Sequence, residues 1–177
     1  FNDTATTEIY TLSLHDALPI SKVVFAESCT GGLVSGALTR VSGISQYHCG
    51  GMVVYRDATK EAYLGISHRL LARCGAVSPQ VAALMAEKVL KRTPEADVAL
   101  SVTGHLGPKA PPELDGKVFI GLACRTGRRG GKPQVAVTPL DASHLSTRLA
   151  RQRWVVEQAL WLLEKHLAAR ADETPAR

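Results

Sequence analysis

The sequence has only four cysteines, and their spacing excludes the common cysteine-based sites. They stand at positions 29, 49, 74 and 124, with no C-x-x-C pair and none of the close spacing that a zinc site needs. The histidines likewise show no metal-binding pattern such as H-E-x-x-H. We therefore expect no metal and no cofactor, and reduced thiols of the kind found in a cytosol.

Long hydrophobic runs are also missing. No apolar stretch approaches the roughly 18 residues of a transmembrane helix, and the first residues lack the basic start and apolar stretch of a signal peptide. The sequence therefore predicts a soluble, cytoplasmic protein with no membrane partner.

Charge is only mildly unbalanced, because 21 basic and 16 acidic side chains give a net charge of +5. Such a balance suits an anionic small molecule as well as nucleic acid. The one basic cluster, residues 125–132, contains three glycines and no aromatic residue on which a base could stack. We interpret it as a hairpin tip between two apolar runs and expect no nucleic-acid partner.

A chain of 177 residues with 45% hydrophobic content fits one globular domain. We assign this domain to residues 21–170. Residues 3–20 resemble the translation of a common DNA sequencing adapter, so residues 1–20 are predicted to be non-native. Residues 171–177 are polar and contain proline, and are predicted to be a disordered tail.

Short apolar runs alternate with helical patterns along this domain. The runs predict strands at 22–26, 51–55, 97–103, 117–123 and 134–138, and the helical patterns cover 32–40, 60–64, 78–92 and 142–170. Strands interleaved with helices predict an α/β fold, a three-layer α/β/α sandwich around a mixed, mostly parallel sheet of about five strands. In the last helix Trp154 and Trp161 share a face, which favours a packed core or a dimer seam, and we expect a homo-oligomer formed through this helix.

The first predicted strand leads directly into Glu27-Ser28-Cys29-Thr30-Gly31-Gly32 and then into a helix. Such a junction places a side chain at the carboxyl edge of the sheet, next to the free amides of a helix N-terminus. Those amides suit an oxyanion or a phosphate, and the pattern alone does not decide between them.

Several ordered motifs resemble the CinA C-terminal family of nicotinamide-nucleotide amidohydrolases. The resemblance extends from about Val23 to Leu163 and includes E-S-C-T-G-G, the G-G-x-x-x-Y that ends at Tyr55, Lys60, Leu64-Gly65, residues 75–78, Thr103-Gly104 and Gly107-Pro108.

The resemblance implies a serine nucleophile, Ser28, activated by Lys60 and Tyr55. A lysine can deprotonate a serine when burial or a nearby cation lowers its pKa, and a tyrosine hydroxyl between the two could relay the proton. The implied reaction is deamidation of nicotinamide mononucleotide to nicotinate mononucleotide and ammonia, a step of pyridine-nucleotide recycling. The partner is then a small nucleotide substrate.

Further residues are candidates for substrate binding: Glu27, Cys29, Thr30, Gly31, Gly32, Thr103, Gly104 and Arg153. Glu27 either orients the loop or pairs with Lys60, and Cys29 is either a buried small hydrophobe or a nucleophile that competes with Ser28. Thr103 and Gly104 end a strand at the predicted edge. Among the arginines at the start of the last helix, Arg153 best fits the position from which the family is expected to contact the phosphate.

One stretch departs from the family pattern. Residues 105–113 carry prolines and bulkier side chains where the family has a glycine-rich loop, which changes one wall of the expected pocket. The alternatives to the amidohydrolase are therefore an amidase for a different amide and a non-catalytic nucleotide-binding module.

Overall fold

The computed structural model describes residues 21–107, 110–126 and 131–172. The predicted non-native segment 1–20, residues 173–177 of the predicted tail and half of the basic cluster lie outside these residues.

A five-stranded sheet forms the centre of the domain, in the order β2-β1-β3-β4-β5. β1 pairs in parallel with both β2 and β3, whereas β4 is antiparallel to β3 and to β5. Four strands therefore run in one direction and β4 runs against them, which confirms the mixed, mostly parallel sheet. The strands are β1 (Val23–Glu27), β2 (His48–Val53), β3 (Val98–Gly104), β4 (Lys117–Cys124) and β5 (Gln134–Asp141).

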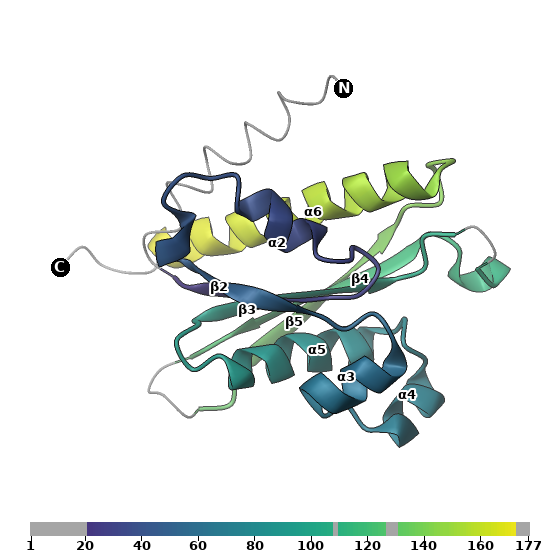
Figure 1. The fold of residues 1–177 in the computed structure, drawn as a ribbon, viewed down its shortest axis with the longest axis horizontal. Coiled ribbons are helices and arrows are strands. Elements are labelled where there is room, and N and C mark those ends of the chain that lie inside the picture. Colours follow the sequence, from purple (N-terminus) through teal and green to yellow (C-terminus); the bar gives the residue numbers. More distant parts are fainter. Residues whose placement is uncertain (1–20, 108–109, 127–130, 173–177) are drawn as a thin grey trace.

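Helices cover both faces of this sheet, which confirms the three-layer sandwich. Figure 1 shows α2 and α6 on one face and α3, α4 and α5 on the other. These helices are α2 (Leu33–Leu38), α3 (Asp57–Leu64), α4 (His68–Cys74), α5 (Pro79–Arg92) and α6 (Arg148–Asp172).

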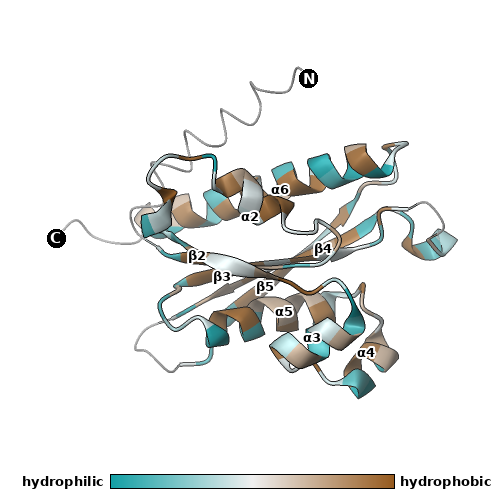
Figure 2. Cartoon of the chain, viewed as in Figure 1, coloured by the Kyte–Doolittle hydropathy of each residue, from teal (hydrophilic) through white to brown (hydrophobic). Residues whose placement is uncertain are grey.

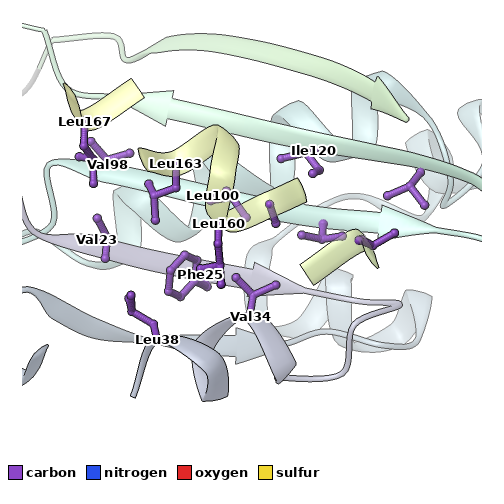
Figure 3. Close-up of a cluster of buried hydrophobic side chains, with 14 of the residues drawn as sticks. Val23, Phe25, Val34, Leu38, Val98, Leu100, Ile120, Leu160, Leu163 and Leu167 are labelled. Carbon is purple, nitrogen blue, oxygen red and sulfur yellow. The ribbon is translucent and has the colours of Figure 1, made fainter. Parts of the chain in front are cut away.

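Two hydrophobic clusters hold the layers together, one on each side of the sheet. Phe25 and Leu100 pack with Leu160 and Leu163 of α6 in the first cluster (Figure 3). The second cluster joins the alternate residues of the strands to α5. Both faces of β1 are thus buried, while Figure 2 shows hydrophilic residues on the outer sides of the helices. Burial on both faces explains why the central strands read as continuous apolar runs.

The helix bounds differ most from the sequence prediction at α3 and α6, while α2 is three residues shorter than predicted. α3 begins at Asp57, three residues earlier than predicted, because the hydroxyl of Thr59 accepts the amide hydrogen of Arg56 and caps the first turn. α6 begins at Arg148 instead of residue 142 and extends beyond residue 170, to Asp172. The hydroxyl of Thr147 accepts the amide of Ala150 and marks its start.

α4 was not predicted, although its sequence carries a signal. Ser67 precedes it and its hydroxyl accepts the amide hydrogen of Leu70. The helix has only seven residues and one buried side chain, Leu71, which is too little for a clear hydrophobic period.

No helix in the described part of the chain is long and apolar enough to cross a lipid bilayer.

Candidate active site

The candidate site forms where β1 and β2 end side by side. Because the two strands are parallel neighbours, their carboxyl ends lie at the same edge of the sheet. The pairing continues one step beyond β2, where the amide of Val54 donates to the carbonyl of Glu27 at 2.8 Å. Ser28, the residue after β1, is thereby placed next to Tyr55.

Lys60 reaches this edge from α3, which begins two residues after Tyr55. Its Nζ lies 3.4 Å from Oγ of Ser28 and 3.2 Å from the carbonyl oxygen of Tyr55. The same carbonyl oxygen accepts the hydroxyl of Ser28 at 3.5 Å. The structure therefore brings a serine hydroxyl and a lysine amine together, 32 residues apart in the chain.

The environment of Lys60 lowers the pKa of its amine. The side chain is 1% exposed, and this burial lowers the pKa of the amine below its usual value. The carboxylate of Asp57, 3.6 Å away, acts in the opposite direction, but it is half exposed. A buried amine next to a serine hydroxyl is the arrangement that a lysine general base requires.

Tyr55 contributes differently from the prediction. Its side chain is 55% exposed, and its hydroxyl accepts a hydrogen bond from the guanidinium of Arg148 at 3.0 Å. The main-chain carbonyl of Tyr55, and not its hydroxyl, contacts Ser28 and Lys60. The predicted proton relay through the hydroxyl is therefore absent from this arrangement of the described residues, because the side chain turns toward α6.

Glu27 occupies the helix amides that were predicted to face a substrate. Its buried carboxylate accepts the amide hydrogens of Gly32, Val34 and Ser35 at 3.0, 3.1 and 2.9 Å. The N-terminus of α2 is thus closed by a side chain of the protein itself, which corrects the expectation of free amides there. Of the two roles considered for Glu27, the geometry supports orientation of the loop.

Two amides of the loop, those of Cys29 and Thr30, have no hydrogen-bond acceptor among the described residues, whereas the amides of Ser28, Gly31 and Leu33 donate to main-chain carbonyls. Thr30 is 0% exposed, so a bound molecule cannot reach its N–H in this structure. The Cys29 N–H directly follows Ser28, where a backbone amide can stabilise an oxyanion.

The side chains of Cys29 and Thr30 point into the protein. Cys29 belongs to the hydrophobic cluster below α6, and burial raises the pKa of its thiol to about 12. It is therefore a buried small hydrophobe and not a competing nucleophile. The Thr30 hydroxyl is buried without a hydrogen-bond partner among the described residues.

The glycines of the loop differ in the space around them. Gly31 and Gly32 both have positive φ, 65° and 98°. A Cβ on Gly31 would meet no atom within 4 Å, whereas one on Gly32 would touch Val53 at 3.4 Å. The space around Gly31 is thus open to an approaching molecule. Glycine is favoured at this position because of the positive φ of the turn, and not because a side chain would clash.

Thr103 and Gly104 serve the fold instead of facing the loop. The fully buried hydroxyl of Thr103 donates to the carbonyl of Ala76 at 2.8 Å. A Cβ on Gly104 would come within 2.7 Å of Val118 in the neighbouring strand β4. The close approach at Gly104 is therefore to β4, the Thr103 hydroxyl is already paired, and the predicted substrate contact of the two residues stays a prediction.

Of the arginines Arg148 and Arg153, Arg148 contacts the site in this structure, and the expected phosphate contact of Arg153 stays a prediction. Arg148 donates to Tyr55 and, at 2.8 Å, to the carbonyl of Gly107. Arg153 is exposed elsewhere on α6 and forms no hydrogen bond with the described residues. Arg148 also lines a cavity of about 540 Å³, whose other walls are Leu106, Ala110, Pro112, Asp115, Ser146, Thr147 and Arg151.

Sequence reasoning missed a further residue of the site, Gln152. Its side-chain amide donates to the carbonyl oxygens of Cys29 and Thr30 at 3.1 and 3.3 Å. Gln152 lies one helical turn after Arg148, so both lie on the same face of α6, where Arg148 contacts Tyr55 and Gln152 contacts the loop. The spacing of four residues between Arg148 and Gln152 is visible in the sequence and indicates a shared helix face. It does not indicate which residues that face contacts.

Comparison with known proteins identifies the family of this site. The sequence model of the CinA C-terminal domain matches residues 12–167. The chain belongs to the CinA C-terminal domain family. The match begins inside the segment predicted to be non-native, a segment outside the described residues, and the origin of that segment stays a prediction.

Relatives with the CinA name share the sequence over much of the chain. A CinA-like protein of Chlorobium phaeobacteroides is 42% identical over 129 residues, which are 72% of this chain and 30% of that protein. A CinA-like protein of Desulfotalea psychrophila is 51% identical over 83 residues, 47% of this chain and 20% of the relative. The CinA domain described here thus corresponds to less than a third of these longer proteins.

Solved CinA structures have the same fold. The competence/damage inducible protein CihA of Agrobacterium tumefaciens is 32% identical, with a TM-score of 0.79 over 92% of this chain and 95% of that one. The competence damage-inducible protein A of Klebsiella pneumoniae is 26% identical, with a TM-score of 0.80 over 92% and 97%. The three-layer arrangement is therefore that of the CinA superfamily.

Proposed function

We propose that this CinA domain is a serine amidohydrolase that deamidates nicotinamide mononucleotide to nicotinate mononucleotide. The observation that carries the proposal is the distance of 3.4 Å between the Ser28 hydroxyl and the buried amine of Lys60. A serine is a weak nucleophile until a base removes its proton, and Lys60 is the base within reach.

The reaction begins with attack of the Ser28 oxygen on the carboxamide carbon, while the serine proton passes to Lys60. The tetrahedral intermediate then collapses, the C–N bond breaks, and Lys60 returns the proton to the departing ammonia. The product of this half is an ester between Ser28 and the nicotinoyl group. Water, deprotonated by Lys60, attacks this ester and releases the carboxylate, and Ser28 regains a proton.

The amide of Cys29 is the proposed oxyanion donor. It lies directly after Ser28 and has no acceptor among the described residues. Removal of one such donor in other hydrolases slows catalysis by about 100- to 1,000-fold, so this amide would supply a large share of the rate.

Arg148 is the proposed contact for the nucleotide phosphate. It links Tyr55 at the catalytic edge to the cavity of about 540 Å³ beside α6, where Arg151 is already paired with Asp115. A guanidinium presents several donors in one plane, which matches a phosphate. The mechanism needs no metal or cofactor. A nucleotide partner, a cytoplasmic location and self-association through α6 complete the proposal.

The test is ammonia release from nicotinamide mononucleotide by the intact chain and by Ser28→Ala. Ser45→Ala provides a matched control, because Ser45 is exposed in the turn before β2, away from the carboxyl edge. We expect release by the intact chain and the control, and none above background by Ser28→Ala.

Two other outcomes would change the proposal. Equal release by Ser28→Ala would exclude Ser28 as the nucleophile. If the intact chain releases no ammonia, and calorimetry shows that both it and Ser28→Ala bind the nucleotide, the protein is a nucleotide-binding module and not an enzyme.

A further inference from the structure

Tyr55 lies between the nucleophile and the proposed phosphate contact. At one end of the residue, the main-chain carbonyl oxygen lies 3.5 Å from the hydroxyl oxygen of Ser28. At the other end, the side-chain hydroxyl accepts a hydrogen bond at 3.0 Å from Arg148, which lines the cavity of about 540 Å³. A nucleotide with its amide carbon at Ser28 and its phosphate at Arg148 therefore extends along the aromatic ring.

The ring of Tyr55 is accessible to such a molecule. Its side chain is 55% exposed, and no aromatic ring or cation of the described residues packs on its face. Arg148 donates to the hydroxyl, at the edge of the ring. That contact directs the side chain toward α6 without covering the face of the ring.

Exposed apolar side chains accompany this ring. Val53 is exposed and comes two residues before Tyr55, so in an extended segment both side chains lie on the same side. Leu149 is exposed as well and follows Arg148 in α6. Ligand sites are lined mainly by apolar and aromatic side chains, and such a surface suits a flat ring.

The proposed substrate carries a positive charge on its ring, because the ring nitrogen of the nicotinamide is bonded to the ribose. The carboxylates in contact with the described residues of this edge are already engaged. Glu27 accepts the helix amides, and Asp57 lies 3.6 Å from the amine of Lys60. Asp115 is paired with Arg151. An exposed aromatic face is then the group that can attract a cation here, because the electron density of the ring gives its face a negative potential.

We propose that the face of Tyr55 binds the pyridinium ring of the substrate by a cation–π contact, so that the site selects N1-substituted pyridinium carboxamides over neutral amides. This inference rests on the proposed function, which supplies the charged substrate. Tyr55 is thereby a binding residue whose ring face, and not its hydroxyl, discriminates between substrates. The attraction grows as the ligand displaces water from the contact.

The test measures binding by calorimetry in the Ser28→Ala background, where Ser28 cannot attack the amide. The two ligands are nicotinamide mononucleotide and its 1,4-dihydro form, which has the same ribose, phosphate and carboxamide but no charge on the ring. Tyr55→Leu removes the aromatic face, whereas Tyr55→Phe keeps the face and removes the hydroxyl. Tyr63→Leu is the matched control, because Tyr63 is equally exposed, at 56%, and makes no hydrogen bond to the described residues.

For Tyr55→Leu we expect the Kd of the charged nucleotide to rise about 3- to 30-fold, and that of the dihydro form to rise less than about twofold. Leucine keeps an apolar side chain for both ligands, so the difference between the two rises reports the charge. Tyr55→Phe should retain most of the preference for the charged form, and Tyr63→Leu should retain all of it.

Equal changes of the two Kd values in Tyr55→Leu would overturn the inference, as would a Tyr55→Phe variant that loses the preference to the same extent. A Ser28→Ala chain that binds the dihydro form as tightly as the charged form would also overturn it. If the preference depends on the ring as expected but the intact chain releases no ammonia, the proposed reaction fails and the inference stands. If Ser28→Ala binds neither nucleotide, both the proposed substrate and this inference fail.

Discussion

Replacing Glu27 by glutamine removes the carboxylate that closes the N-terminus of α2. The carboxylate accepts three amide hydrogens at 2.9 to 3.1 Å and is 1% exposed, so water does not replace it. Hydrogen bonds to a charged group contribute about 1.5 to 3 kcal/mol each, and glutamine keeps one acceptor oxygen while turning an NH₂ group toward amide donors. We expect a loss of about 3 kcal/mol in the free energy of unfolding, or about 6 to 12 °C in Tm for a domain of this size.

Calorimetric unfolding measures this effect, with Glu113→Gln as the control, because Glu113 is exposed and makes no hydrogen bond to the described residues. A Tm for Glu27→Gln within about 1 °C of the control would refute the assignment of Glu27 to the helix amides. The pH dependence of the rate separates the second role considered for Glu27. If the Glu27 carboxylate paired with Lys60, Glu27→Gln would shift the acidic limb of the pH–rate profile. Because Glu27 binds the helix amides instead, we expect no shift.

Three further predictions concern single contacts. Asp57→Asn removes the carboxylate that raises the pKa of Lys60, so the acidic limb of the kcat/KM profile should move to lower pH. An unchanged limb would show that the acidic limb does not report the titration of Lys60. Burial lowers the pKa of His48 below its usual 6.5, so its contribution to stability is present above that pH and is lost as the pH falls through the folded-state pKa. Denaturant unfolding between pH 7.5 and 5 should therefore show a smaller loss for His48→Gln than for the intact chain, and equal losses would contradict this. Gly104→Ala forces a Cβ against Val118 and should lower the free energy of unfolding in denaturant by about 1 to 3 kcal/mol. An unchanged midpoint would show that β4 moves to accommodate the Cβ without a loss of stability.

The sheet could be predicted from the sequence because its strands are short apolar runs. β1 and β3 are buried along nearly their whole length, so each appears as an uninterrupted hydrophobic segment. The neighbourhood of Ser28, Tyr55 and Lys60 was implied by the family resemblance, and the parallel pairing of β1 and β2 explains it, because the carboxyl ends of both strands lie at one edge. Short elements were less predictable, and α4 was missed because only one of its side chains is buried.

The finer geometry of the site depends on contacts between residues far apart in the chain, which a local pattern does not contain. The sequence could not show that Glu27 folds back on the helix amides, because carboxylates at this position can also face a substrate. The exposed side chain of Tyr55 is directed by Arg148, 93 residues later. Arg148 and Gln152 share one face of α6, and only the packing of that helix against the loop distinguishes them from Arg153.

The measurement that tests the central claim most directly is ammonia release by Lys60→Met. Methionine fills the buried space of the lysine stem and removes the amine that lies 3.4 Å from Ser28. Loss of a general base lowers rates by about 100- to 10,000-fold, so we expect kcat to fall within this range while calorimetric binding of nicotinamide mononucleotide persists. A Lys60→Met chain that releases ammonia at the rate of the intact chain would contradict the activation of Ser28 by Lys60.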